Sequence, residues 1–104
     1  MLDETLQALA DPTRRALLAR LAEGEARVTD LARPFPMSLN AVSKHIRVLE
    51  RGGLVRRRRE GREHILSVQP HGLDEAARWI EAQRNLWAWR LGRLDDALKE
   101  HPDD

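Results

Sequence analysis

The sequence predicts one mainly α-helical domain that carries a single small β-hairpin. Apolar residues recur at helical spacing in several short segments and in one long C-terminal segment. Glycine and proline residues separate these segments. The stretch from Leu54 to Val68 instead has two strand-like runs on either side of a glycine-containing turn. A chain of 104 residues fits one hydrophobic core, so we expect residues 1–104 to form a single domain.

Three helices are expected in the first third of the chain, over residues 2–10, 12–23 and 30–33. Asp11 and Pro12 separate the first two. Aspartate is a favourable N-cap, and proline at the first helical position lacks only an amide that the helix leaves unbonded. Thr29 is expected to cap the third helix in the same way.

A fourth helix is expected over about residues 38–52, capped by Ser38 and ended by Gly52 and Gly53. Its apolar residues recur at spacings of three, four and three, which predicts one buried stripe: Leu39, Val42, Ile46 and Leu49. The opposite face is polar and cationic.

The hairpin is expected over about residues 54–69, with Glu60-Gly61-Arg62 as its turn, and Pro70 and Gly72 close it. The last helix is expected over about residues 73–99, followed by a frayed tail from His101.

Positive charge is concentrated in the middle of the chain. Residues 38–73 contain eight basic and three acidic side chains, whereas both flanking thirds have an excess of acidic residues. Such asymmetry indicates an anionic partner more strongly than the overall charge of +1 does. A solvated basic face is the alternative.

The order of elements, α-α-α-α-β-β-α, is that of a winged helix-turn-helix, in which the fourth helix enters the major groove of DNA beside a basic hairpin. Asparagine suits adenine and lysine suits guanine, and serine hydroxyls suit phosphate oxygens. The candidate DNA-binding residues are Ser38, Asn40, Ala41, Ser43, Lys44, Arg47, Arg59 and Arg62. An amphipathic surface helix and a charge-guarded edge strand are the alternatives.

The last helix has more apolar surface than a monomer of this size is expected to expose. One stripe repeats every seven residues through Leu73, Ile80 and Trp87, and a second includes Trp79, Leu86 and Trp89. We therefore expect a homodimer whose interface includes Leu2, Leu6, Leu9, Trp79, Ile80, Leu86, Trp87, Leu91 and Leu94. An aromatic ligand pocket is the rival explanation of the tryptophan cluster.

Several classes of protein are not expected. The sequence has no cysteine, which excludes disulfides, thiol redox sensing and thiolate metal ligands. It has no apolar run long enough to cross a bilayer and no signal peptide, so a cytoplasmic location is expected. No phosphate-binding loop or nucleophile–base arrangement indicates an enzyme.

Two stretches carry a resemblance to a known family: ALADPTRRALLARLAEGEARVTDLA, residues 8–32, and SLNAVSKHIRVLERGGLVRRRREGREHILSV, residues 38–68. They resemble the ArsR/SmtB family of bacterial winged-helix repressors. The resemblance implies a homodimer that binds an inverted repeat in a promoter and represses transcription until a signal releases it.

The metal-ligand motifs of that family are missing. The third-helix region, residues 28–32, has no cysteine, and the last helix, expected over about residues 73–99, has no histidine. The four histidines, His45, His64, His71 and His101, are scattered without ligand spacing. No metal or cofactor is therefore expected. The identity of a small-molecule inducer, and whether one exists, is left open.

Two other functions remain as alternatives at this point. One is a winged helix retained as a protein-interaction module, which the basic middle third disfavours. The other is binding to DNA or RNA without sequence preference.

Overall fold

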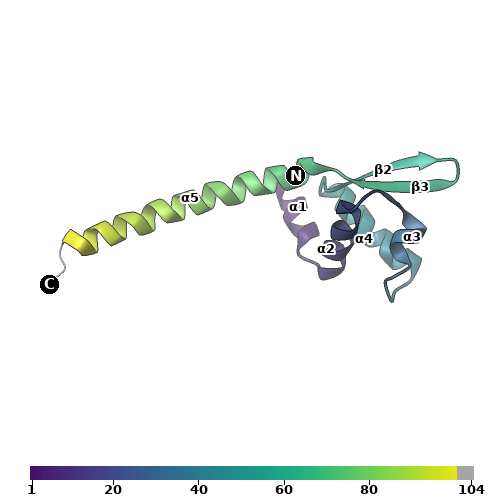
Figure 1. Cartoon of the computed structure of the whole chain (residues 1–104), viewed down its shortest axis with the longest axis horizontal. Helices are drawn as coiled ribbons and strands as arrows, with labels where there is room; N and C mark the ends of the chain where they lie inside the picture. Colours follow the sequence, from purple (N-terminus) through teal and green to yellow (C-terminus); the bar gives the residue numbers. More distant parts are fainter. Residues whose placement is uncertain (101–104) are drawn as a thin grey trace.

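The computed structural model describes residues 1–100, with side chains described as far as Arg93. The elements are α1 (Leu2–Leu9), α2 (Pro12–Ala22), β1 (Ala26–Arg27), α3 (Val28–Ala32), α4 (Leu39–Arg51), β2 (Val55–Glu60), β3 (Glu63–Val68) and α5 (Pro70–Glu100). Figure 1 shows α1 to α4 and the strands gathered at one end, with α5 projecting away as a long rod. The molecule is accordingly elongated, 72 × 26 × 22 Å. The tail from His101, which is expected to fray, lies outside the described residues.

The expected hairpin is present and belongs to a three-stranded antiparallel sheet with the order β1-β3-β2. β2 and β3 pair from Val55 opposite Val68 to Glu60 opposite Glu63. The turn is therefore two residues long, and Gly61 adopts φ 61°, a conformation that favours glycine. Strand β1 was not predicted, because two residues carry no alternation pattern.

The core lies between the helices and the inner face of the sheet. Its largest fully buried residues include Leu17, Leu31, Val42, Ile46, Leu49, Leu54 and Leu66. The predicted stripe of α4 is thus confirmed at three of its four positions. Leu39 is the exception: its exposed fraction is 49%, because it lies in the first turn, beyond the end of the core.

Two of the three predicted caps are confirmed. Asp11 accepts a hydrogen bond from the Arg14 amide at 3.0 Å, and Ser38 accepts one from the Ala41 amide at 3.1 Å. The prediction for Thr29 is wrong: α3 begins at Val28 with Arg27 as its N-cap. The cause is β1, which leads into α3 without an intervening loop.

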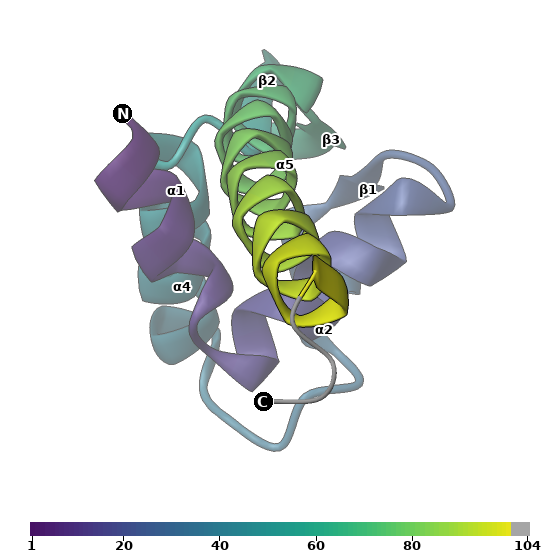
Figure 2. The same cartoon turned by 90° about the vertical axis from the view of Figure 1, so that its left-hand side faces the viewer.

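A close contact between backbones sets the start of α5. The Gly72 amide donates to the Gly53 carbonyl at 3.0 Å, and the buried Thr5 hydroxyl donates to the Gly52 carbonyl at 2.6 Å. Pro70 and Gly72 therefore belong to the first turn of α5 and do not close the hairpin. Figure 2, viewed along α5, shows α1 and α4 on one side of this helix and β1 on the other, with the hairpin partly behind α5.

No helix within residues 1–100 is both long and apolar enough to cross a membrane.

Candidate nucleic-acid interface

The outward face of α4 is polar and cationic. Asn40, Lys44 and Arg47 are exposed on the same helix whose opposite face buries Val42 and Ile46 completely. This separation follows from the spacing of apolar residues, because positions three and four apart share one face of a helix. Ser38 is exposed, and Ala41 and Ser43 are half-buried on the flanks. An accessible row of donors therefore runs along α4.

The four consecutive arginines of β2 have different environments. Arg57 is half-buried and bonded to Glu50 of α4, with its Nη2 2.8 Å from Oε1 and its Nε 3.4 Å from Oε2. Bidentate pairs of this kind fix orientation as well as charge. Arg57 thus attaches the hairpin to α4 at a set angle.

Arg58 lies on the face of the sheet opposite to Arg57. It contacts both carboxylate oxygens of Glu25, at 2.9 and 3.0 Å, and one oxygen of Glu60. The hydrogen bonds that Arg58 donates to Glu25 and Glu60 raise the pKa of its guanidinium, and the same bonds to Glu25 lower the pKa of the Glu25 carboxyl. The sequence does not predict the Arg58–Glu25 pair, because partners 33 residues apart leave no local pattern.

The cations of the hairpin tip remain accessible. Arg59 is exposed and its Nε donates to the Gly61 carbonyl at 3.0 Å, which holds the side chain against the turn. Arg62, the second residue of the turn, is also exposed. Arg57 and Arg58 neutralise local carboxylates, so among the described residues the exposed arginines of the hairpin without a carboxylate partner are Arg56, near the start of β2, and Arg59 and Arg62 at the tip.

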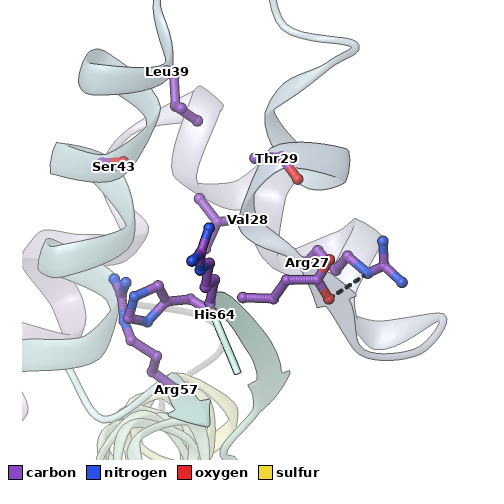
Figure 3. A pocket seen from close by; sticks show the side chains of 9 residues that line it. Arg27, Val28, Thr29, Leu39, Ser43, Arg57 and His64 are labelled. Carbon is purple, nitrogen blue, oxygen red and sulfur yellow. Dashed lines mark ion pairs between the residues drawn. The ribbon is translucent and has the colours of Figure 1, made fainter. Parts of the chain in front are cut away.

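A hollow of about 360 Å³ lies between α4 and the hairpin. Figure 3 shows Leu39 and Ser43 projecting from α4, Val28 and Thr29 from α3, and His64 and Arg57 from the hairpin. Arg62 and Arg27 also line it, and Glu63 on its rim is paired with Arg27 at 3.1 Å. The predicted α4 and hairpin residues Ser43 and Arg62 therefore lie at one site, although they are 19 positions apart in the sequence.

Comparison with known proteins agrees with this geometry. The Helix-turn-helix domain family matches residues 9–58. HTH-type transcriptional regulator Rv2034 of Mycobacterium tuberculosis is 46% identical over 98% of this chain and 92% of its own. The crystal structure of an ArsR family transcriptional regulator, RHA00566, is similar with a TM-score of 0.79 and 41% identity, over 84% of this chain and 90% of that one.

This chain belongs to the ArsR/SmtB family. A further solved structure, the homodimeric winged helix-turn-helix DNA-binding domain Mb0332 of Mycobacterium bovis, is 30% identical with a TM-score of 0.62, over 95% of this chain and 82% of that one. The predicted winged helix-turn-helix class is confirmed. As a member of the ArsR/SmtB family, the protein is a DNA-binding transcriptional regulator and not an enzyme.

In this ArsR/SmtB chain, Arg14 of α2 makes polar contacts with both α1 and α4 that the sequence does not predict. Arg14 bonds the carbonyls at the end of α1, with its Nε 2.8 Å from the Ala8 oxygen and its Nη2 3.0 Å from the Gln7 oxygen. Its Nη1 lies 3.2 Å from Nδ1 of His45 on α4. The Arg14 amide, through its hydrogen bond, is the main cause that lowers the pKa of Asp11. One arginine of α2 therefore connects α1, α2 and α4.

The apolar residues of α5 are exposed in this single chain of the ArsR/SmtB regulator. The large exposed residues of α5 include Trp79, Ile80, Leu86, Trp87 and Leu91. Figure 1 shows α5 projecting from the rest of the domain. Leu2, Leu6 and Leu9 of α1 are half-buried, and the side chain of Leu94 lies outside the described residues.

Trp89 is set apart from these residues. At 100° per residue it lies about 180° around the helix from Ile80. Its ring stacks under the Arg93 guanidinium, with 4.8 Å between Cζ and the ring centroid. It lies about 60° around the helix from Leu86, at the outer edge of the predicted stripe of Trp79 and Leu86, and about 160° from Trp87.

Within the described part of the chain, no cluster of three or more histidine and acidic side chains could hold a metal ion.

Proposed function

We propose that the protein is a homodimeric repressor that binds an inverted-repeat operator. Each α4 occupies the major groove, and each hairpin tip contacts the adjacent backbone or minor groove. The proposed DNA contacts are Ser38, Asn40, Ala41, Ser43, Lys44, Arg47, Arg59 and Arg62. Two α4 helices related by a dyad would address half-sites about 34 Å apart, one turn of the duplex.

One observation carries this proposal: the cations of α4 and of the hairpin tip are exposed together. Lys44 and Arg47 face outward, and Arg62 lines the hollow that α4 borders. Within the described part of the chain, none of the three has a carboxylate partner. Such a surface is unfavourable unless a polyanion meets it.

Dimerisation through α1 and α5 is the second part of the proposal. The residues Trp79, Ile80, Leu86, Trp87 and Leu91 form an apolar arc on α5, and among the described residues α5 has no packing partner beyond its first turns (Figure 1). A second copy would bury this arc by twofold symmetry. The interface would include Leu2, Leu6, Leu9, Trp79, Ile80, Leu86, Trp87, Leu91 and Leu94. Repression would end when a signal, whose chemistry the site does not specify, shifts the dimer away from the DNA-binding arrangement.

The test is a triple variant, Lys44→Ala, Arg47→Ala and Arg62→Ala. Each neutralised phosphate contributes about 0.9 to the slope of log affinity against log salt, so losing three cations per protomer reduces the slope by about five. We expect specific binding to be lost at 150 mM salt while the dimer persists. Fluorescence anisotropy over a salt series, with an operator selected in vitro by the native protein, measures the operator affinity and its salt slope.

A matched control removes the same charge elsewhere: Arg20→Ala, Arg78→Ala and Arg93→Ala, on α2 and α5. This control should keep the operator preference and most of the salt slope. Operator affinity that survives the first triple variant would overturn the proposed contacts. A native protein that selects no sequence at all would favour the interaction-module or non-specific alternatives.

A further inference from the structure

Leu39 is an apolar residue in an unexpected place. It shares the spacing of Val42, Ile46 and Leu49, all with exposed fractions of 0%, yet its own exposed fraction is 49%. A single exposed leucine is ordinary on a protein surface. This one, however, is the first residue of α4, next to Asn40, on the helix with the exposed cations.

Leu39 borders two hollows, each of which is lined by both polar and apolar residues. On the hairpin side it borders the hollow that Ser43, Arg62 and His64 also line. On the other side it borders a second hollow of about 290 Å³, whose lining includes Phe35 and Met37. Figure 3 shows its side chain extending from α4 into the space beside Val28 and Thr29. Leu39 is thus an apolar projection between two hollows at the N-terminal end of α4.

The chemistry of the surface selects the occupant. Arg62 on the rim has no carboxylate partner among the described residues and attracts a nucleic-acid backbone, whereas a second copy packed here about a twofold axis would bring Arg62 against its like charge. In the major groove of DNA, the apolar group exposed on a base edge is the C5 methyl of thymine. When this methyl group packs against a leucine, apolar surface is removed from water on both sides and no polar group has to be desolvated.

We propose that Leu39 contacts a thymine C5 methyl in each half-site and thereby determines a preference for thymine at that position. This inference rests on the proposed function, because it requires α4 to lie in the major groove. It adds a specificity-determining residue outside the set of polar contacts. The contact would be apolar, so it would contribute to the choice of base and not to the salt dependence.

The experiment removes single methyl groups from the DNA. Each thymine of the selected operator is replaced in turn, in both half-sites, by deoxyuridine, and affinity is measured for the native protein and for Leu39→Ala. One buried methyl corresponds to about a four-fold change in affinity, so removing the two methyls of one symmetric position should weaken binding of the native protein by about fifteen-fold. For Leu39→Ala, deoxyuridine at that position should cause no additional loss of affinity. For Leu39→Met, it should still cause most of the loss seen with the native protein.

The outcomes separate the inference from the function on which it rests. If the native protein binds the operator but no deoxyuridine position depends on Leu39, the inference is wrong and the repressor proposal stands. If a methyl effect persists unchanged in Leu39→Ala, another side chain, such as Ala41, makes the contact. If the native protein selects no operator, the proposed function itself fails. Circular dichroism melts of both variants show whether they fold.

Discussion

At the scale of single residues, stability should respond to acid through Asp11. Its carboxylate caps α2, and the Arg14 amide, with the Arg14 and His45 charges, lowers its pKa. A group with a lowered pKa in the folded state stabilises the fold above its unfolded pKa, about 3.9, and that stability is lost as pH falls through the folded value. Asp11→Asn keeps a capping oxygen but does not titrate.

Thermal unfolding of the native protein and Asp11→Asn, measured between pH 5 and pH 2, tests this. The melting temperature of the native protein should fall more steeply over this range. Glu25, whose pKa is also lowered, is unchanged in both proteins and contributes equally. Parallel curves would show that the Asp11 cap does not couple to protonation.

At the scale of elements, the direction of α5 depends on glycine at position 72. A Cβ there would clash with the Gly52 carbonyl oxygen and lie 2.8 Å from that of Gly53, both backbone atoms that cannot move alone. Gly72→Ala should therefore lower the free energy of unfolding by about 1–3 kcal/mol, the usual cost of overpacking. Urea denaturation followed by circular dichroism measures it.

Gly92 is the matched control for that substitution. It lies in the same helix, and a Cβ there meets nothing within 4 Å. Alanine in a helix interior is more favourable than glycine by about 0.5–1 kcal/mol, so Gly92→Ala should leave stability unchanged or raise it. Equal effects at both positions would mean that the contact of Gly72 with the Gly52-Gly53 turn does not position α5.

At the scale of the whole molecule, the shape makes sense as half of a dimer. Trp87, 64% exposed, lies on the apolar arc, whereas Trp89, 57% exposed, lies outside it under Arg93. A buried aromatic residue commonly contributes about 2 kcal/mol or more to an interface and occurs twice in a symmetric dimer. Trp87→Glu should therefore weaken dimerisation by about 10³-fold, and Trp89→Glu should not.

Sedimentation equilibrium at micromolar concentration distinguishes the two variants. Trp87→Glu should sediment as a monomer. Its helix content should also be lower, because the outer part of α5 loses its packing partner. A native protein that is monomeric, or a Trp89→Glu variant that dissociates equally, would contradict the proposed interface. The loss of dimer should also weaken operator binding, since one α4 offers few base contacts.

Local chemistry alone determined much of this protein. The spacing of Val42, Ile46 and Leu49, the caps at Asp11 and Ser38, and the turn at Gly61 are effects between residues a few positions apart, and each was predictable. They establish the order of helices and strands, and with it the winged helix-turn-helix class.

Tertiary structure alone decided which of these residues are available to a partner. Arg57 and Arg58 are adjacent to Arg59 and chemically identical to it, yet only they are paired, with Glu50 and Glu25. Leu39 has the spacing of a core residue but projects past the end of the core. Such outcomes depend on contacts between segments distant in sequence, which no local pattern encodes, because burial and charge pairing are properties of the packed fold.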